Sequence, residues 1–161
     1  MLAPDPKSGI REQQPLVLMA LTVLGEAEGE PYQGKLAVAH VIANRMKKHG
    51  KSVADTVLAP WQFSCWNAGD PRKLFLVNVI HKAADNVLPG LWEESLQASE
   101  CALNEPESDP TGGSTHYCTI AIWSCDDSRR KHPRWHSLQE IEAGITQELL
   151  RLGHHVFAKT L

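Results

Sequence analysis

The chain has 161 residues, of which 42% are hydrophobic and 22% are charged, and its formal net charge at pH 7 is −3. These values are typical of a single soluble globular domain that is long enough to bury a core. The net charge and the short basic runs 45–51 and 129–131 give no electrostatic reason to expect nucleic acid or an anionic membrane surface as a partner.

The N-terminal segment 1–14 is polar and lacks the charged-then-apolar layout and the cleavage site of a secretory signal. The apolar run that follows, Leu16–Leu24, is far shorter than the ~20 residues of a membrane span. We therefore expect an N-terminal extension at 1–14, a single domain at 15–161, and synthesis in the cytoplasm.

The first predicted helix begins at Pro15 and carries apolar residues at helical spacing. It runs into Gly25-Glu26-Ala27-Glu28-Gly29-Glu30-Pro31, where two glycines and a proline should end it. A glutamate in this position can rest against the core while its carboxyl group faces a cleft. Because burial disfavours the charged form of a carboxyl group, such a site suits a general acid. A solvated acidic helix end is the simpler interpretation.

A second, largely apolar helix is predicted from residue 32 or 33 to about residue 48, and Gly50 should end it. Its apolarity makes it the central buried helix. His40 lies among apolar neighbours and should be a hydrogen-bonded core residue rather than a ligand. Asn44 and Arg45, at the end of this helix, should hold a loop by hydrogen bonds.

The loop Trp61-Gln62-Phe63-Ser64-Cys65-Trp66-Asn67 places three aromatic rings among small polar groups. Sugars offer apolar C–H faces beside hydroxyl groups, so a sugar-binding groove needs aromatic platforms next to hydrogen-bonding side chains. We expect Gln62, Ser64 and Trp66 to face such a groove and Phe63 to fill the core.

Residues 109–122 combine turn-forming residues with β-branched and aromatic ones, and predict a turn followed by an extended segment at 114–122. We place this segment across the cleft from Glu26, with Gly113, Thr115 and Tyr117 as substrate-binding residues. Between this segment and the aromatic loop, further helices are predicted at 53–58, 71–87 and 91–104.

A last helix is predicted from Leu138 to Leu152, because a capping box precedes apolar residues at i, i+4 and i+8, and Gly153 can end it. Phe157 should anchor the tail in the core. His154 and His155 are adjacent, so their side chains should diverge in any extended segment.

Four cysteines are present, and four allow three pairings. Cytoplasmic synthesis favours reduced thiols. They are Cys65, Cys101, Cys118 and Cys125.

Four segments resemble, in the same order, the SleB-type cell-wall hydrolases, which include spore-cortex-lytic enzymes and related phage and bacterial muralytic domains. The segments are Gly25–Arg45, Pro60–Asn67 (PWQFSCWN), Asp109–Tyr117 (DPTGGSTHY) and Gly153–Phe157 (GHHVF). The resemblance covers about 17–157 and implies a mainly α (α+β), lysozyme-like single domain that cuts peptidoglycan glycan strands. By motif position, the essential glutamate of the family falls on Glu26. We count Glu30 among the substrate-binding residues, and we expect no cofactor and no metal.

The mechanism that the resemblance implies starts with a neutral Glu26, which protonates the glycosidic oxygen between N-acetylmuramic acid and N-acetylglucosamine. A lysozyme-type hydrolase needs a second carboxylate, for which Glu28, Glu30 and Asp109 are the candidates by sequence. A lytic transglycosylase needs a single acid, and we favour this reaction.

Two other classes stay open. A zinc-dependent amidase or peptidase would draw ligands from His116, Cys118, His154 and His155, but no ligand pair at metal spacing is present. The third class is a non-catalytic wall-binding module. For the favoured class we expect a monomeric phage endolysin that is made in the cytoplasm and reaches the wall after holin-type release.

Overall fold

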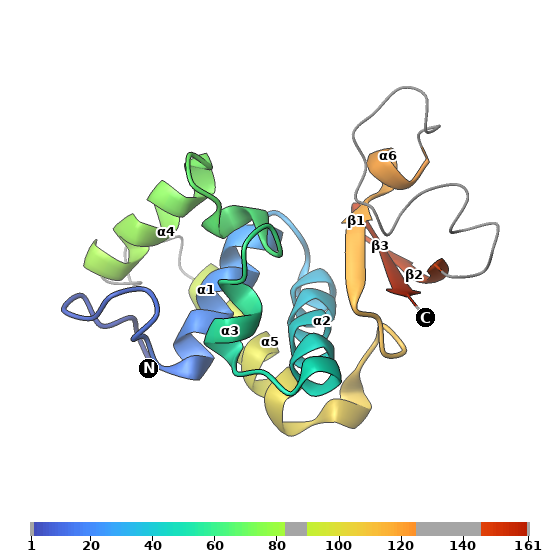
Figure 1. The fold of residues 1–161 in the computed structure, drawn as a ribbon, viewed down its shortest axis with the longest axis horizontal. Helices are drawn as coiled ribbons and strands as arrows, with labels where there is room; N and C mark the ends of the chain where they lie inside the picture. Colours follow the sequence, from blue (N-terminus) through green and yellow to red (C-terminus); the bar gives the residue numbers. More distant parts are fainter. Residues whose placement is uncertain (1, 83–89, 125–145, 161) are drawn as a thin grey trace.

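The computed structural model of the protein describes residues 2–82, 90–124 and 146–160 (Figure 1). The helices are α1 (Pro15–Ala27), α2 (Tyr32–His49), α3 (Val53–Val57), α4 (Pro71–Lys82), α5 (Leu91–Asn104) and α6 (Ile120–Trp123). The short 3-10 turns are η1 (Ser64–Trp66) and η3 (Pro106–Ser108), and the strands are β1 (His116–Thr119), β2 (Thr146–Leu152) and β3 (His155–Thr160).

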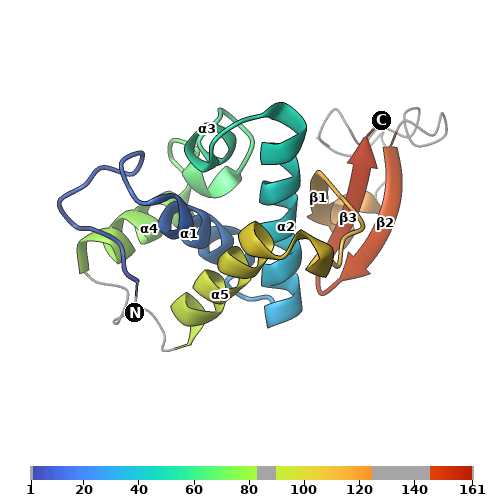
Figure 2. The same ribbon diagram turned by 90° about the horizontal axis from the view of Figure 1, so that it is seen from below.

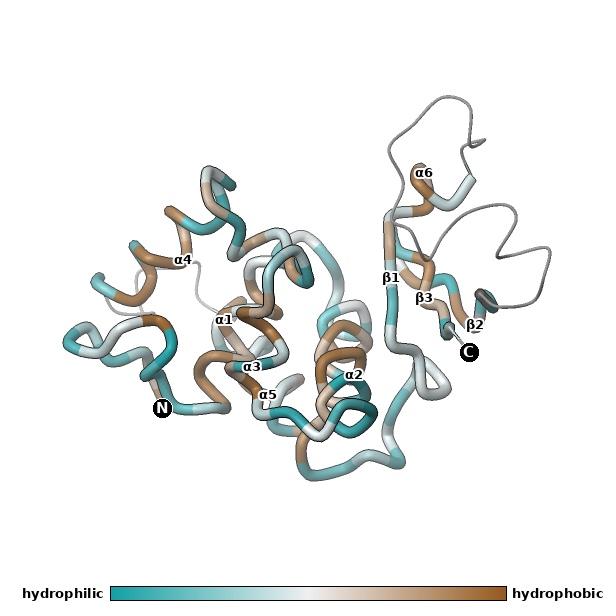
Figure 3. The backbone as a smooth tube through the Cα atoms, in the orientation of Figure 1, coloured by the Kyte–Doolittle hydropathy of each residue, from teal (hydrophilic) through white to brown (hydrophobic). Residues whose placement is uncertain are grey.

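Three helices, α1, α2 and α5, pack against one another and form the core, and α2 lies between α1 and the small sheet (Figures 1 and 2). Apolar residues line α1 throughout and part of α2 (Figure 3). In α1 every residue from Val17 to Leu24 is buried. The expected mainly helical, lysozyme-like architecture with a buried central helix and a short β segment is confirmed.

The ends of several helices follow from local sequence signals. Pro15 occupies the first turn of α1, and Gly50 ends α2 in the left-handed conformation, with its N–H bonded to the carbonyl of Met46. Ser52 caps α3 by accepting a hydrogen bond from the N–H of Asp55. The predictions for α1, α2, α3 and α5 are therefore confirmed to within a residue or two. For the predicted helix at 71–87, α4 confirms the part up to Lys82, and the rest lies outside the described residues.

The sheet has the order β1-β3-β2, and both pairs are antiparallel. Tyr117 lies opposite Phe157 in the register of β1 and β3. A two-residue connection, Gly153 and His154, joins β2 to β3. Gly153 has a φ of 57°, which suits the first position of a tight hairpin turn. Phe157 is fully buried, so the prediction that it anchors the tail is confirmed.

The predicted helix at Leu138–Leu152 is wrong over the residues that the structure describes, because Thr146–Leu152 is strand β2. Leu150 and Leu152 are two residues apart and both pack against the core, which is the periodicity of a strand. Pairing with β3 thus overrides the helical spacing of the apolar residues. Residues 138–145, including most of the capping box, lie outside the described residues.

The extended segment predicted at 114–122 is also shorter than expected. Strand β1 ends at Thr119, whose hydroxyl accepts a hydrogen bond from the N–H of Ile122 and so caps α6. A threonine at the end of a strand can therefore start a helix that residue composition alone does not reveal.

Residues 2–14 are held by hydrogen bonds within the segment and by contacts with α3 and α5. The side chain of Gln13 is buried and donates to the carbonyls of Asp5 and Ser8, and the indole of Trp92 donates to the carbonyl of Leu2. The division into 1–14 and 15–161 stays a prediction. None of the described helices has the length and apolarity that crossing a membrane requires.

Candidate active site

Glu26 lies in the last turn of α1, where its half-buried carboxylate meets residues of two other elements. The backbone N–H of Cys65 in η1 donates to Oε1 at 2.9 Å, and the hydroxyl of Ser64 lies 3.4 Å from the same oxygen. The hydroxyl of Tyr117 in β1 donates to Oε2 at 2.6 Å. The carboxylate is therefore held in one orientation by groups from two other parts of the chain, η1 and β1.

Gly25 lets η1 approach α1 closely enough for this contact. A Cβ at residue 25 would lie 2.8 Å from Cβ of Cys65 and 2.9 Å from Cδ1 of Leu76. Only a glycine leaves this space, so residue 25 determines how near the N–H of Cys65 comes to Glu26. Burial and then the charge of Glu26 raise the pKa of the Cys65 thiol far above its usual range, so the thiol stays neutral and is not a nucleophile.

Tyr117 stands on the opposite side of Glu26, as expected. Its ring meets that of His155 edge-on at a centroid distance of 5.3 Å and lies 5.7 Å from that of Phe157. Burial and the nearby Glu26 raise the pKa of Tyr117 well above 10. The phenol therefore remains protonated at neutral pH and acts as a hydrogen-bond donor to Glu26.

Arg45 ties the two sides of the site together from the end of α2. Its Nε donates to the carbonyl of Thr115 at 2.6 Å, and its NH1 donates to the carbonyl of Gln62 at 3.4 Å. The guanidinium carbon lies 4.8 Å from the ring centre of Phe63. Burial lowers the pKa of Arg45, while Tyr117 and Glu26 oppose this shift. The prediction that Arg45 holds a loop by hydrogen bonds is confirmed.

Asn44, the neighbour of Arg45, holds the turn that precedes β1. Its amide donates to the carboxylate of Asp109 and to the carbonyl of Ser114. Asp109 also accepts from the N–H groups of Thr111 and Gly113. Although burial opposes ionisation, these hydrogen bonds lower the pKa of Asp109. Asn44 thus has the structural role predicted for it, and so does His40, which is buried and lies 3.1 Å from the hydroxyl of Ser108.

Two residues predicted to bind substrate shape the same turn instead. Gly113 has a φ of 87° and donates its N–H to Asp109, and Thr115 is buried, with its carbonyl bonded to Arg45. Neither lines the groove in which Glu26 lies. We therefore correct the prediction that Gly113 and Thr115 bind substrate. The geometry of the turn explains Gly113, and the hydrogen bonds of its backbone explain Thr115.

The aromatic loop is arranged differently from the prediction. Trp66 is only 7% exposed, and its indole N–H donates to the hydroxyl of Thr22 in α1, so its expected place in the groove is wrong. Trp61 is 83% exposed, has a φ of 63°, and lines the groove. Phe63 is buried, as expected. Trp61 is the aromatic side chain that sequence reasoning missed, because composition does not distinguish the directions of two tryptophans in one loop.

Glu30, predicted to bind substrate, points elsewhere. Its carboxylate is buried and lies 3.0 Å from Nδ1 of His154 and 3.4 Å from Nδ1 of His155. A Cβ at residue 153 would lie 1.9 Å from Oε2 of Glu30, so Gly153 lets the β2–β3 turn close over this carboxylate. The expected divergence of the two histidines applies to an extended segment, whereas His154 lies in the turn, and both rings face Glu30.

These residues surround a groove with a volume of about 440 Å³, within the range of small-molecule sites. Its lining residues are Glu26, Arg45, Trp61, Gln62, Ser64, Arg72, Tyr117, Cys118, Thr119, Ile122 and His155. We call this the active-site groove. Of the predicted site residues, it brings together Glu26, Gln62, Ser64 and Tyr117. Glu26 is the only carboxylate among the described residues that line it.

Metal ligands are not gathered in the described part of the chain. Within residues 2–82, 90–124 and 146–160, no group of three His, Cys, Asp or Glu side chains is arranged to hold a metal ion. Cys65 and Cys101 are free thiols, and Cys125 lies outside the described residues.

Comparisons with known proteins agree with this architecture. The chain is 35% identical over 102 residues to a spore cortex-lytic enzyme of Halalkalibacterium halodurans, which is 62% of this chain and 26% of that protein. It is 45% identical over 49 residues to the spore cortex-lytic enzyme of Bacillus subtilis, or 29% of this chain and 16% of that protein. The chain thus spans well under half the length of these relatives.

Two solved structures share the fold. The catalytic domain of the Bacillus cereus SleB protein superposes with a TM-score of 0.56 at 23% identity, covering 96% of this chain and 95% of that one. The catalytic domain of the germination-specific lytic transglycosylase SleB from Bacillus anthracis gives 0.57 at 24% identity, covering 97% and 99%. Residues 29–158 match the cell wall hydrolase family, a segment that begins just after Glu26. Because this match includes most of the 161 residues, the chain belongs to the cell wall hydrolase family.

Proposed function

We propose that this protein cleaves peptidoglycan glycan strands between N-acetylmuramic acid and N-acetylglucosamine as a lytic transglycosylase, with Glu26 as acid and then as base. The observation that carries this proposal is that Glu26 is the one carboxylate among the described residues that line the active-site groove. A hydrolase of the lysozyme type needs a second carboxyl group about 5–5.5 Å away for retention, or about 6.5–9.5 Å away for inversion. Among the candidates from sequence, Asp109 is held in the turn before β1 and Glu30 under the β2–β3 turn.

The hydrogen bonds of Glu26 suit a group that changes its protonation state. Each carboxylate oxygen has two lone pairs, and the donors Cys65 and Tyr117 each occupy one. The remaining lone pairs can carry the proton that is given to the glycosidic oxygen. After this transfer, both donors stabilise the negative charge on Glu26, which lowers the cost of the step.

The proposed reaction is completed without a water molecule. Protonation by Glu26 breaks the bond between C1 of muramic acid and the glycosidic oxygen, with oxocarbenium character at C1. The ionised Glu26 then takes the proton of the C6 hydroxyl group, and O6 bonds to C1. The products are a 1,6-anhydromuramic acid end and a free N-acetylglucosamine hydroxyl, and Glu26 returns to its protonated form. The solved relative described as a lytic transglycosylase supports this choice.

Mass analysis of fragments released from purified cell walls tests the proposal. We expect muropeptides with anhydro ends and no new reducing ends, and a Glu26→Gln variant that folds normally but is slower by about 10²–10⁴-fold or more. Fragments heavier by one water, with reducible muramic acid ends, would instead show hydrolysis. A folded Glu26→Gln variant with near-normal activity would remove Glu26 from the mechanism. The phage endolysin role and holin-type release stay predictions.

A further inference from the structure

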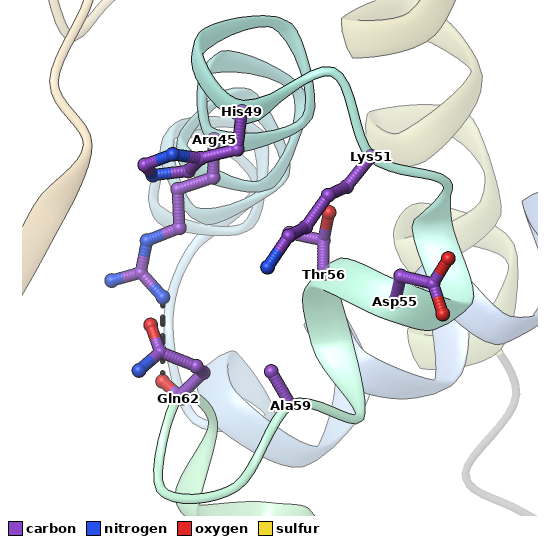
Figure 4. Close-up of a pocket in the computed structure, with 7 residues that line it drawn as sticks. All are labelled: Arg45, His49, Lys51, Asp55, Thr56, Ala59 and Gln62. Carbon is purple, nitrogen blue, oxygen red and sulfur yellow. Dashed lines mark hydrogen bonds between the residues drawn. The ribbon is translucent and has the colours of Figure 1, made fainter.

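A second pocket adjoins the active-site groove at the end of α2 (Figure 4). It has a volume of about 260 Å³ and is lined by Arg45, His49, Lys51, Asp55, Thr56, Ala59 and Gln62. We call it the side pocket. Arg45 and Gln62 line both the side pocket and the active-site groove, so the two spaces lie next to each other.

The side pocket is positively charged. The side chain of Lys51 reaches into it, and Arg45 and His49 form one wall (Figure 4). The one carboxylate of the lining, Asp55, is turned away from its centre and forms an ion pair with Arg11 (Figure 4). The charge of Asp55 is compensated mainly by Arg11 outside the pocket and to a lesser extent by Lys51, and Arg45 and Lys51 line the pocket.

The positive charges around the side pocket also act on a neighbouring histidine, His116. The pKa of His116 falls to about 4, first because of burial and then because of the charges of Arg45, Lys48 and His49. Burial disfavours any charged group at this end of α2, whereas the positive charges there disfavour a cation and favour an anion.

Thr56 adds an observation that does not depend on charge. Its side chain is 6% exposed and lines the side pocket, and within the described part of the chain its hydroxyl oxygen has no hydrogen-bond partner. Buried hydroxyl groups are nearly always bonded, since leaving one without a partner costs about 1–3 kcal/mol. A ligand oxygen that enters the side pocket would accept the hydrogen bond that Thr56 can donate.

We propose that the side pocket binds a carboxylate carried by the lactyl side of muramic acid, while the glycan lies in the active-site groove. This inference rests on the proposed function. The amino sugars of the glycan backbone are uncharged, whereas the lactyl group ends in a carboxylate or continues into a peptide stem that contains carboxylates. Guanidinium, ammonium and hydroxyl donors together match a carboxylate, which accepts hydrogen bonds and carries one negative charge.

The test measures binding of the full chain with Glu26→Gln, which prevents turnover, to pelleted cell walls. One wall sample is untreated, and in the other the carboxylates are converted to amides with carbodiimide and ammonia. In this background we compare Lys51→Ala, Thr56→Val and, as a matched loss of one charge, Lys47→Ala. Lys47 is exposed and lies outside the side pocket.

We expect Lys51→Ala and Thr56→Val each to weaken binding to untreated walls by about fivefold to tenfold, with a much smaller effect on amidated walls. The Lys47→Ala control should match the parent on both. Thr56→Val should not lower the melting temperature, because the hydroxyl has no internal partner to lose. If the two substitutions weakened binding equally on untreated and amidated walls, or weakened it on neither, the inference would be overturned.

Denuded glycan strands, made by removing the peptides with an amidase, identify the source of the carboxylate. If the loss caused by Lys51→Ala persists on denuded strands, the bare lactyl carboxylate is bound; if it disappears, the peptide stem supplies the group. A parent protein that binds neither wall sample would contradict the proposed function itself. Binding that ignores amidation and both substitutions would contradict the side-pocket inference alone.

Discussion

At the scale of single residues, the two tryptophans of the aromatic loop have opposite surroundings. Trp66 is buried and donates a hydrogen bond to Thr22, whereas Trp61 is exposed beside Glu26 at the active-site groove. Aromatic faces stack on the apolar C–H faces of sugars, and an exposed aromatic ring is free to do so. Trp61 is thus the aromatic platform of the proposed glycan site, and Trp66 belongs to the core.

Exchanging each tryptophan for alanine should separate these roles. We expect Trp66→Ala to lower the free energy of unfolding by about 3–5 kcal/mol, because it leaves a cavity in the core and removes the hydrogen bond to Thr22. Trp61→Ala should leave that free energy within about 0.5 kcal/mol and weaken wall binding and cleavage. Urea unfolding and a turbidity assay on walls measure the two effects. A strongly destabilised Trp61→Ala variant with normal activity per folded molecule would contradict this assignment.

At the scale of elements, the position of η1 against α1 decides how Glu26 is held. Gly25 in α1 is in contact with Cβ of Cys65, and the N–H of that same residue bonds to Glu26. The contact between η1 and α1 therefore also sets the orientation of the Glu26 carboxylate. Arg72 in α4 reinforces it by donating a hydrogen bond to the carbonyl of Gly25.

Gly25→Ala should disturb this feature, and Gly29→Ala is its control. The added methyl group at residue 25 overpacks the contact with Cys65, which costs about 1–3 kcal/mol of unfolding free energy. A displacement of ~1 Å at the carboxylate can cost on the order of 10²-fold in rate. At Gly29 a Cβ meets nothing within 4 Å, so the same change should keep activity and stability. Equal activity of the two variants would show that η1 does not position Glu26.

At the scale of the whole molecule, three buried or half-buried histidines lie on α2, β1 and β3, near the contact between the sheet and the helical core. The pKa of His40, of His116 and of His155 is lowered, in each case mainly by burial. Above about pH 6.5 these groups are neutral in both the folded and the unfolded chain. As the pH falls below this value, the unfolded chain takes up protons first, so the folded protein loses stability.

The free energy of unfolding should therefore decrease between about pH 6.5 and pH 4, the window set by the pKa of His116. His116→Gln keeps a hydrogen-bonding side chain near Thr115 and removes one titrating group, so the decrease should be less steep. His81→Gln, at an exposed position of α4, is the matched control. Urea unfolding at several pH values measures the slopes, and identical slopes for His116→Gln and the parent would contradict the argument.

Local sequence signals determined much of the helical part. Pro15, Ser52 and Gly50 mark helix ends that the structure reproduces, since caps act through the backbone of their own segment. The same holds for Glu26 at the end of an apolar helix and for Arg45 as the residue that holds a loop. Each of these inferences needed only neighbours in sequence or a residue pattern that resembles a known family.

Tertiary contacts determined the strand at the C-terminal end and the directions of several side chains. Thr146–Leu152 is a strand because β3 pairs with it, although its apolar residues also fit a helix. Glu30 turns to His154 because Gly153 leaves space there, and Trp66 turns inward because Thr22 offers an acceptor. The partners of Glu30 and Trp66 are distant in the sequence, whereas β3 directly follows β2 but the spacing of the apolar residues does not indicate the pairing. The sequence by itself thus determined most of the helices and placed Glu26 at the end of one of them, and only the folded chain decided which side chains surround its carboxylate.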